Sequence, residues 1–152
     1  MTLQSAGLLM CRHHKDHPEF FLVHPGGPFW AKKNEGVWGI PKGLVEEGEA
    51  LLQTAEREFF EETGITPVAP FHSLGTVQLK SGKIIHAWSF DGSWDEGQGI
   101  TSNFISIAWP PRSGKSISIP EIDRAEWMDF KKARLLINPG QLPFLDRANA
   151  LH

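Results

Sequence analysis

The chain has 152 residues, 40% of them hydrophobic, and a formal net charge of −3. This length fits one domain spanning residues 1–152, and the acidic balance excludes a general electrostatic attraction to extended nucleic acid or to an anionic membrane. The single cysteine, Cys11, excludes an internal disulfide and favours a reducing compartment, the cytoplasm.

The first half of the chain alternates short apolar runs with loops. Residues 1–10 carry an apolar patch with no basic segment before it, which argues against a signal peptide and against a membrane span. Residues 6–12 and 20–24 predict two strands joined by a polar turn, and a loop rich in proline and glycine follows. Residues 50–63 place apolar side chains at helical spacing, and Gly64 follows where a helix commonly ends.

The second half predicts further strands and two helices. Residues 74–80 and 84–90 are expected to form a hairpin with a Ser-Gly turn. Two more strands and two helices are expected at residues 103–109, 126–128, 130–137 and 141–150. These elements together indicate a mixed α+β or αβα domain.

Three glutamates of the predicted helix lie in one narrow sector. Glu58, Glu61 and Glu62 are three and four residues apart, so at 3.6 residues per turn they share one face. A solvated surface is the ordinary interpretation of such a face. Glu62, however, lies only about 20° from Leu51 in direction, which turns it toward the protein. Because clustered carboxylates repel one another unless a cation compensates, this face favours a platform for a hard divalent metal ion.

The stretch from Gly43 to Ile65 carries a longer pattern around these glutamates. It reads Gly-x5-Glu-x7-Arg-Glu-U-x-Glu-Glu-x-Gly-U, where U is a bulky aliphatic or aromatic residue. This pattern resembles the Nudix box with every fixed position filled, Phe59 being an aromatic residue where aliphatic ones are commoner. The resemblance implies an α+β Nudix fold, an αβα sandwich with a mixed β-sheet and a loop-helix-loop motif. It also implies hydrolysis of a phosphoanhydride bond in a nucleoside diphosphate-linked substrate.

The resemblance assigns metal-binding roles residue by residue. Glu58, Glu61 and Glu62 match the metal-binding carboxylates, and the Gly43 carbonyl matches a further ligand. The metal implied is Mg²⁺, with Mn²⁺ as an alternative.

The remaining chemical roles concern the helix anchor and the general base. Arg57 and Glu49 resemble the pair that holds the helix against its preceding loop, and Glu49 is also a candidate base. Glu58 is the first choice for the base that takes the proton from the attacking water. Glu121 is the expected carboxylate from outside the box, with a loop surface glutamate as the alternative interpretation and Glu96 as the second choice.

Residues before the box give weaker indications of the substrate. Trp38-x-x-Pro41-Lys42-Gly43 resembles the animal-type diadenosine tetraphosphate hydrolases and other polyphosphate-cleaving members, and it is shared with decapping-type enzymes. The chain has no tyrosine, whereas dinucleoside-polyphosphate members often carry one beyond the box. Lys80 stands near the place where the ADP-ribose group has a proline.

Loop side chains supply the candidates for substrate binding. Trp30 and Trp94 lie in predicted loops and are candidates to stack on a base, with a partner interface as the alternative. Lys32, Lys33 and Lys42 are candidates for distal phosphates, although a solvated surface is expected for at least one of them. Core positions are expected for the tryptophans of predicted strands, namely Trp88, Trp109 and Trp127.

Several functions remain open at this point. The first is hydrolysis of a dinucleoside polyphosphate such as diadenosine tetraphosphate. The alternatives are a nucleotide-sanitising (d)NTP pyrophosphohydrolase, a non-enzymatic nucleotide-sensing Nudix domain, and RNA 5′-end processing, which the net acidity disfavours. The expected partner is a small-molecule nucleotide, with no membrane and no extended nucleic acid, and the chain is expected to be a monomer or homodimer. The cluster of Cys11, His13, His14, Asp16 and His17 is interpreted as a polar turn, because its spacing matches no closed zinc site.

Overall fold

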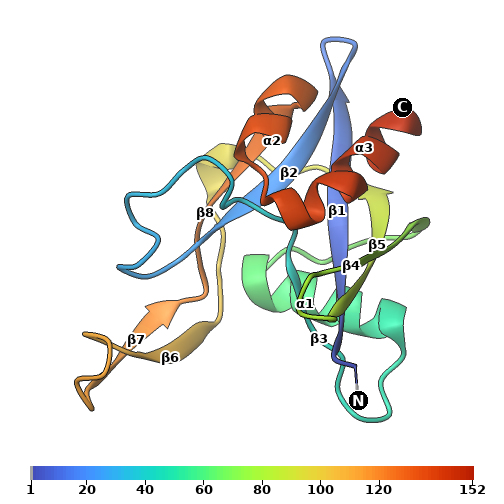
Figure 1. Cartoon of the computed structure of the whole chain (residues 1–152). Helices are drawn as coiled ribbons and strands as arrows, with labels where there is room; N and C mark the ends of the chain where they lie inside the picture. The colour runs from blue at the N-terminus through green and yellow to red at the C-terminus, as the bar shows by residue number, and fades with distance from the viewer. Residues whose placement is uncertain (1) are drawn as a thin grey trace.

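A mixed β-sheet forms the centre of the molecule, seen in a computed structural model that describes residues 2–152 (Figure 1). The strand order is β4-β5-β1-β2-β8, and β3 pairs with β1 off this path. β1 runs parallel to β5 and antiparallel to β2 and β3. The strands of this sheet are β1 Gln4–His14, β2 His17–Pro25, β3 Lys42–Leu44, β4 His72–Gln78, β5 Ile84–Asp91 and β8 Ile122–Asp129.

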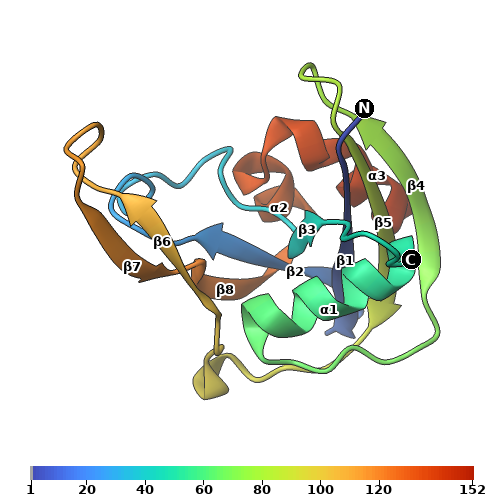
Figure 2. The same cartoon turned by 90° about the horizontal axis from the view of Figure 1, so that it is seen from below.

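Helices cover both faces of the sheet. Because successive strand residues point to opposite faces, β1 sends Leu8 and Met10 toward the core that includes Phe59 of α1. It sends Leu9 and Cys11 into the second core, which α2 and α3 complete. Figure 2 shows α1 on one side of the sheet and α2 and α3 on the other. The helices are α1 Leu51–Thr63, α2 Phe130–Leu136 and α3 Leu142–Ala150. The predicted αβα sandwich is confirmed.

A second, two-stranded sheet projects from the body of the molecule (Figure 1). It pairs β6 Phe104–Ala108 with β7 Ser116–Pro120 in antiparallel register. The strand at β6 was expected, but β7 was not, although residues 116–119 alternate serine and isoleucine as a half-buried strand does. β8 is also longer than the predicted 126–128. The prediction was too short because polar residues 123 and 124 interrupt the apolar run, whereas pairing with β2 extends the strand past them.

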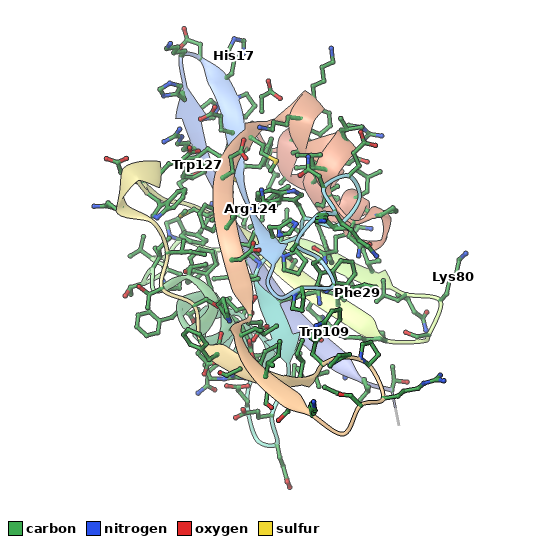
Figure 3. The ribbon with its side chains drawn as sticks, turned by 90° about the vertical axis from the view of Figure 1, so that its left-hand side faces the viewer. His17, Phe29, Lys80, Trp109, Arg124 and Trp127 are labelled. Carbon is green, nitrogen blue, oxygen red and sulfur yellow. The ribbon has the colours of Figure 1, made fainter. Side chains whose placement is uncertain are left out.

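The remaining differences are small shifts of element ends. β4 begins and ends two residues before the predicted strand at 74–80. Two 3₁₀ turns lie in expected loops, η1 Glu96–Gln98 and η2 Pro139–Gln141. The predicted polar turn at the histidine cluster is the tip of the β1–β2 hairpin, and His17 lies at this end of the molecule (Figure 3). No helix in the described part of the chain is both long enough and apolar enough to span a membrane.

Two local features place α1 against the sheet. Gly64 ends the helix in the left-handed region, with φ 78°, and its N–H donates to the Phe60 carbonyl at 2.7 Å. At the other end, β3 pairs with β1 through Gly43 and Ala6, which sets the start of the box beside the face that α1 covers. The loop between β3 and α1 therefore lies close to the glutamates of the helix.

Candidate functional site

Three carboxylates from two separate parts of the fold converge at one point. Glu58 and Glu62 come from α1, and Glu121 comes from the bend between β7 and β8. Carboxylate oxygens of all three lie within 4.8 Å of one another. Glu62 is 3% exposed, and its Oε2 has no hydrogen-bond partner within residues 2–152. This geometry agrees with the expected inward direction of Glu62 and brings the expected outside carboxylate to the helix.

Burial and mutual repulsion disfavour full ionisation of this group. The pKa of Glu62 is raised well above its ordinary value, first by burial and then by the charge of Glu121 and a hydrogen bond with Glu58. Burial is also the main cause of the raised pKa of Glu121. Three converging carboxylates, one of them with a buried oxygen that has no hydrogen-bond partner, fit a hard divalent cation. Such a cation would relieve the repulsion between the carboxylates.

Gly43 is required by the close approach of Glu58. A Cβ atom added at residue 43 would lie 2.1 Å from the carboxyl carbon of Glu58 and within 2.4 Å of both its oxygens. Any other residue at this position would therefore push the Glu58 carboxylate out of its place. The fixed glycine at the start of the box has a steric explanation.

Arg57 anchors the helix to the loop before it. Its Nε and Nη2 donate to the two oxygens of Glu49 at 2.7 and 3.0 Å, and its Nη1 donates to Glu58 at 2.9 Å. Glu49 also accepts from the Thr54 hydroxyl at 2.5 Å. The hydrogen bonds from Arg57, followed by that from Thr54, lower the pKa of Glu49 to about 2. Glu49 is thus a weak base whose oxygens are already engaged.

Glu61 lies apart from the converging carboxylates. Its side chain is 41% exposed and accepts from Arg57 Nη1 at 3.1 Å. The three glutamates that the helix pattern grouped are therefore divided, because Arg57 holds Glu61 at the rim while Glu58 and Glu62 face Glu121.

A pocket of about 170 Å³ opens beside the carboxylates. Lys42 lies in its wall with Glu62 and Glu121, and burial lowers the pKa of this lysine while the charge of Lys83 adds to the effect. Val23, Ile40 and Ile122 are among the apolar residues of the wall, and Gln141 supplies an amide whose Oε1 accepts from the Ile40 N–H at 2.9 Å. The expected phosphate ligand Lys42 thus lies next to the carboxylate group.

The other predicted substrate residues lie elsewhere. Trp30 packs edge-to-face against Phe29, and the Lys33 ammonium sits 3.8 Å from the Phe29 ring centroid. Lys32 is exposed on the same loop. Figure 3 shows Phe29 on this loop.

Trp94 requires a correction. It is 7% exposed, its Nε1 donates to the Gly99 carbonyl, and its ring packs edge-to-face on Phe21. Its position in a loop misled the prediction, because the loop folds back onto the core. Among the tryptophans expected in the core, Trp127 is buried and Trp88 packs against the core, whereas Trp109 lies half-buried beyond the end of β6.

Two residues near the site were not found from the sequence. Asn103 donates from Nδ2 to Glu121 Oε1 at 3.1 Å, and Gln141 lines the pocket. Both act through contacts with residues far away in sequence, and no local sequence pattern predicts such contacts. Glu96, the second choice for an outside carboxylate, instead accepts from the Trp127 backbone N–H at 3.0 Å.

The same architecture occurs in known structures. A *C. elegans* Ap4A hydrolase in a binary complex matches with a TM-score of 0.68 at 21% identity, over 99% of this chain and 97% of that chain. The NUDIX domain of *Shewanella oneidensis* NrtR, complexed with ADP ribose, matches with a TM-score of 0.69 at 19% identity, over 99% and 88%. At these identities the likeness concerns the fold.

Sequence relatives lead to the same family. An RNA pyrophosphohydrolase of *Rhizobium meliloti* is 31% identical over 129 residues, covering 74% of this chain and 68% of the relative. An RNA pyrophosphohydrolase of *Caulobacter vibrioides* is 39% identical over 64 residues, covering 35% of this chain and only 37% of the relative.

A family model described as NUDIX domain matches residues 1–148. The chain belongs to the Nudix family, as the box predicted.

Proposed function

We propose that the protein hydrolyses a phosphoanhydride bond in a nucleoside diphosphate-linked substrate and that it requires Mg²⁺. The observation that carries this proposal is the meeting of Glu58, Glu62 and Glu121 within 4.8 Å, with a buried oxygen of Glu62 left unpartnered. A structural role alone does not explain three converging carboxylates, because each buried, unpaired charge lowers stability.

The carboxylate group and the glycine beside it would hold the metal. We assign Glu58, Glu62 and Glu121 as ligands, with the Gly43 carbonyl as a further ligand from the box. Glu61, which Arg57 holds at the rim in the metal-free protein, would join them only by turning toward the bound metal. When bound, Mg²⁺ or Mn²⁺ neutralises charge on the phosphate oxygens and makes phosphorus easier to attack.

The side chains of the site have separate tasks in the hydrolysis. A water oxygen bonds to phosphorus while the bond from phosphorus to the bridging oxygen breaks, and the water proton passes to a carboxylate. Glu58 is the proposed base, and Glu121 is the second candidate. Lys42 contributes positive charge beside the leaving phosphate.

Arg57 and Glu49 act by holding the helix in place. Their paired hydrogen bonds fix the loop that carries Gly43 against α1. The pKa of Glu49, lowered to about 2, supports an anchoring role over a role as base.

For the substrate we propose a dinucleoside polyphosphate first, supported by the Trp38-to-Gly43 motif and by the fold shared with the Ap4A hydrolase. A second candidate is RNA, because several sequence relatives carry the name RNA pyrophosphohydrolase. A nucleoside triphosphate and a sensed nucleotide ligand complete the set of alternatives.

Chromatographic product analysis separates these candidates. Purified protein with Mg²⁺ is incubated with nucleoside di- and triphosphates, diadenosine tetraphosphate, sugar nucleotides and a short 5′-triphosphorylated RNA. Fastest release of ATP and AMP from diadenosine tetraphosphate supports the first candidate, and fastest release of pyrophosphate from the RNA supports the second. Glu62→Gln should remove most turnover, whereas Glu56→Gln, the same change on the same helix outside the site, should not. No turnover of any substrate would contradict the hydrolase proposal and favour the sensor.

A further inference from the structure

Glu121 stands outside the box, so its place beside α1 needs its own explanation. It lies in the bend between β7 and β8, while Glu58 and Glu62 belong to α1. Carboxylates whose oxygens lie within 4.8 Å of one another repel. Glu121 is the one that could move away, because a bend rather than a helix carries it. Some contact must therefore hold it in the group.

The segment at residues 101–103, which we call the strap, is bonded to the end of α1. The Thr101 N–H donates to the Thr63 carbonyl at 2.9 Å, and the Asn103 N–H donates to the Glu61 carbonyl at 2.8 Å. The last carbonyls of a helix lack partners within the helix, so the strap satisfies two groups that the helix leaves open.

The other side of the strap is bonded to the bend that carries Glu121. The Glu121 N–H donates to the Asn103 carbonyl at 2.9 Å, and the Ile122 N–H donates to Ser102 Oγ at 3.0 Å. Ser102 Oγ in turn donates to the Asn103 carbonyl at 3.1 Å. The strap thus joins the helix that carries two carboxylates to the bend that carries the third.

The Asn103 side chain adds a bond to the carboxylate itself. Its Nδ2 donates to Glu121 Oε1 at 3.1 Å, while its Oδ1 is buried without a hydrogen-bond partner in residues 2–152. An unpaired buried acceptor destabilises a protein. A side chain present only for packing would avoid this loss, so the amide is placed for its donor.

We propose that Asn103 is a positioning residue that, with the strap, delivers Glu121 to the metal-binding carboxylates of α1. The inference rests on the proposed function for its metal, but the placement of Glu121 is a property of the metal-free protein. Asn103 fixes one oxygen of Glu121 and so selects the direction of the carboxylate. Ser102 fixes the backbone beside it.

The test is a double-mutant cycle between Asn103 and Glu121. Asn103→Leu keeps the size of the side chain and removes the donor, and Glu121→Ala removes the carboxylate that accepts from it. Mn²⁺ affinity is measured by electron paramagnetic resonance without substrate, and metal-free crystal structures give the position of residue 121. Asn149→Leu on α3 is the matched control, and Asn103→Ser is the second variant should the leucine variant fail to fold.

We expect Asn103→Leu to weaken Mn²⁺ binding by about 10- to 100-fold, the usual effect of losing a residue that supports a metal ligand. In the Glu121→Ala background the same change should have little further effect, because Asn103 acts through Glu121. The metal-free crystal structure should show Glu121 turned out of the group. An unmoved Glu121, or an equal loss of affinity in both backgrounds, would overturn the proposal. Absence of Mn²⁺ binding to the wild-type protein, with Glu121 displaced in the variant, would instead contradict the proposed function and leave the strap supported.

Discussion

Replacing Glu62 by glutamine should stabilise the metal-free protein while removing its response to metal. At 4.8 Å and an effective dielectric constant of about 20, two full charges repel by about 3.5 kcal/mol. The stability lost through this repulsion has an upper limit, because the protein can protonate one carboxyl instead. Protonating a carboxyl of ordinary pKa at pH 7.5 takes about 4 kcal/mol. We therefore expect Glu62→Gln to raise the free energy of unfolding by about 1–4 kcal/mol in EDTA, which is several °C in melting temperature for a chain of this size.

Magnesium should narrow the stability difference between the two proteins, and reverse it where that difference is below about 2.7 kcal/mol. A ligand present at 100 times its dissociation constant stabilises the folded state by about 2.7 kcal/mol. The wild-type protein should gain this stabilisation, and Glu62→Gln should gain little, because it lacks the buried charged ligand.

The assay is urea unfolding at pH 7.5, in EDTA and in saturating Mg²⁺, with Glu56→Gln as the control on the same helix. The control should follow the wild type in both conditions. Two results together would refute the assignment of Glu62 as a metal ligand that neighbouring carboxylates repel when the metal is absent. These are a Glu62→Gln protein less stable than wild type in EDTA, and an unchanged gain in stability from Mg²⁺.

Three further predictions follow from the same geometry. The raised pKa values of Glu62 and Glu121 mean that the folded state holds more protons than the unfolded state above about pH 4.5. The metal-free protein should therefore lose stability as pH rises from 5 to 8, measured by urea midpoints in EDTA. An unchanged or rising midpoint would contradict the pKa shifts. Gly43→Ala should lower turnover and Mg²⁺ affinity by about 10- to 100-fold with a retained circular dichroism spectrum, because its methyl group would displace the Glu58 carboxylate; wild-type kinetics would show that the loop yields instead. Arg57→Lys should lower the free energy of unfolding by about 1–3 kcal/mol, since a lysine cannot reproduce the paired hydrogen bonds, and equal denaturation midpoints would argue against the anchor.

The fold was predictable where a periodic pattern or a recognised motif covered the element. The helix at residues 50–63 agrees with α1 to within one residue, because its apolar stripe and Gly64 act locally. β7 at Ser116–Pro120 escaped notice because it is short, exposed and stabilised mainly by pairing with β6. Such a strand depends on a partner that no local pattern reveals.

The site divides in the same way. The direction of Glu62 follows from helix geometry, and Glu121 was proposed from its position in the chain. Trp94 was misassigned because a loop position does not reveal that the ring folds back onto Phe21. Asn103 could not be identified from the sequence, because its proposed role depends on contacts with the end of α1 and with a bend 18 residues away.

The most direct test of the central claim is the rate of phosphoanhydride hydrolysis on the best substrate of the panel, measured with Mg²⁺ titrated from zero. Wild-type protein and Glu56→Gln should turn over only with the metal, and Glu62→Gln should lose most of its turnover while remaining folded. Near-normal turnover by Glu62→Gln at an unchanged Mg²⁺ optimum would contradict the claim that the carboxylates at α1 hold the metal that drives hydrolysis.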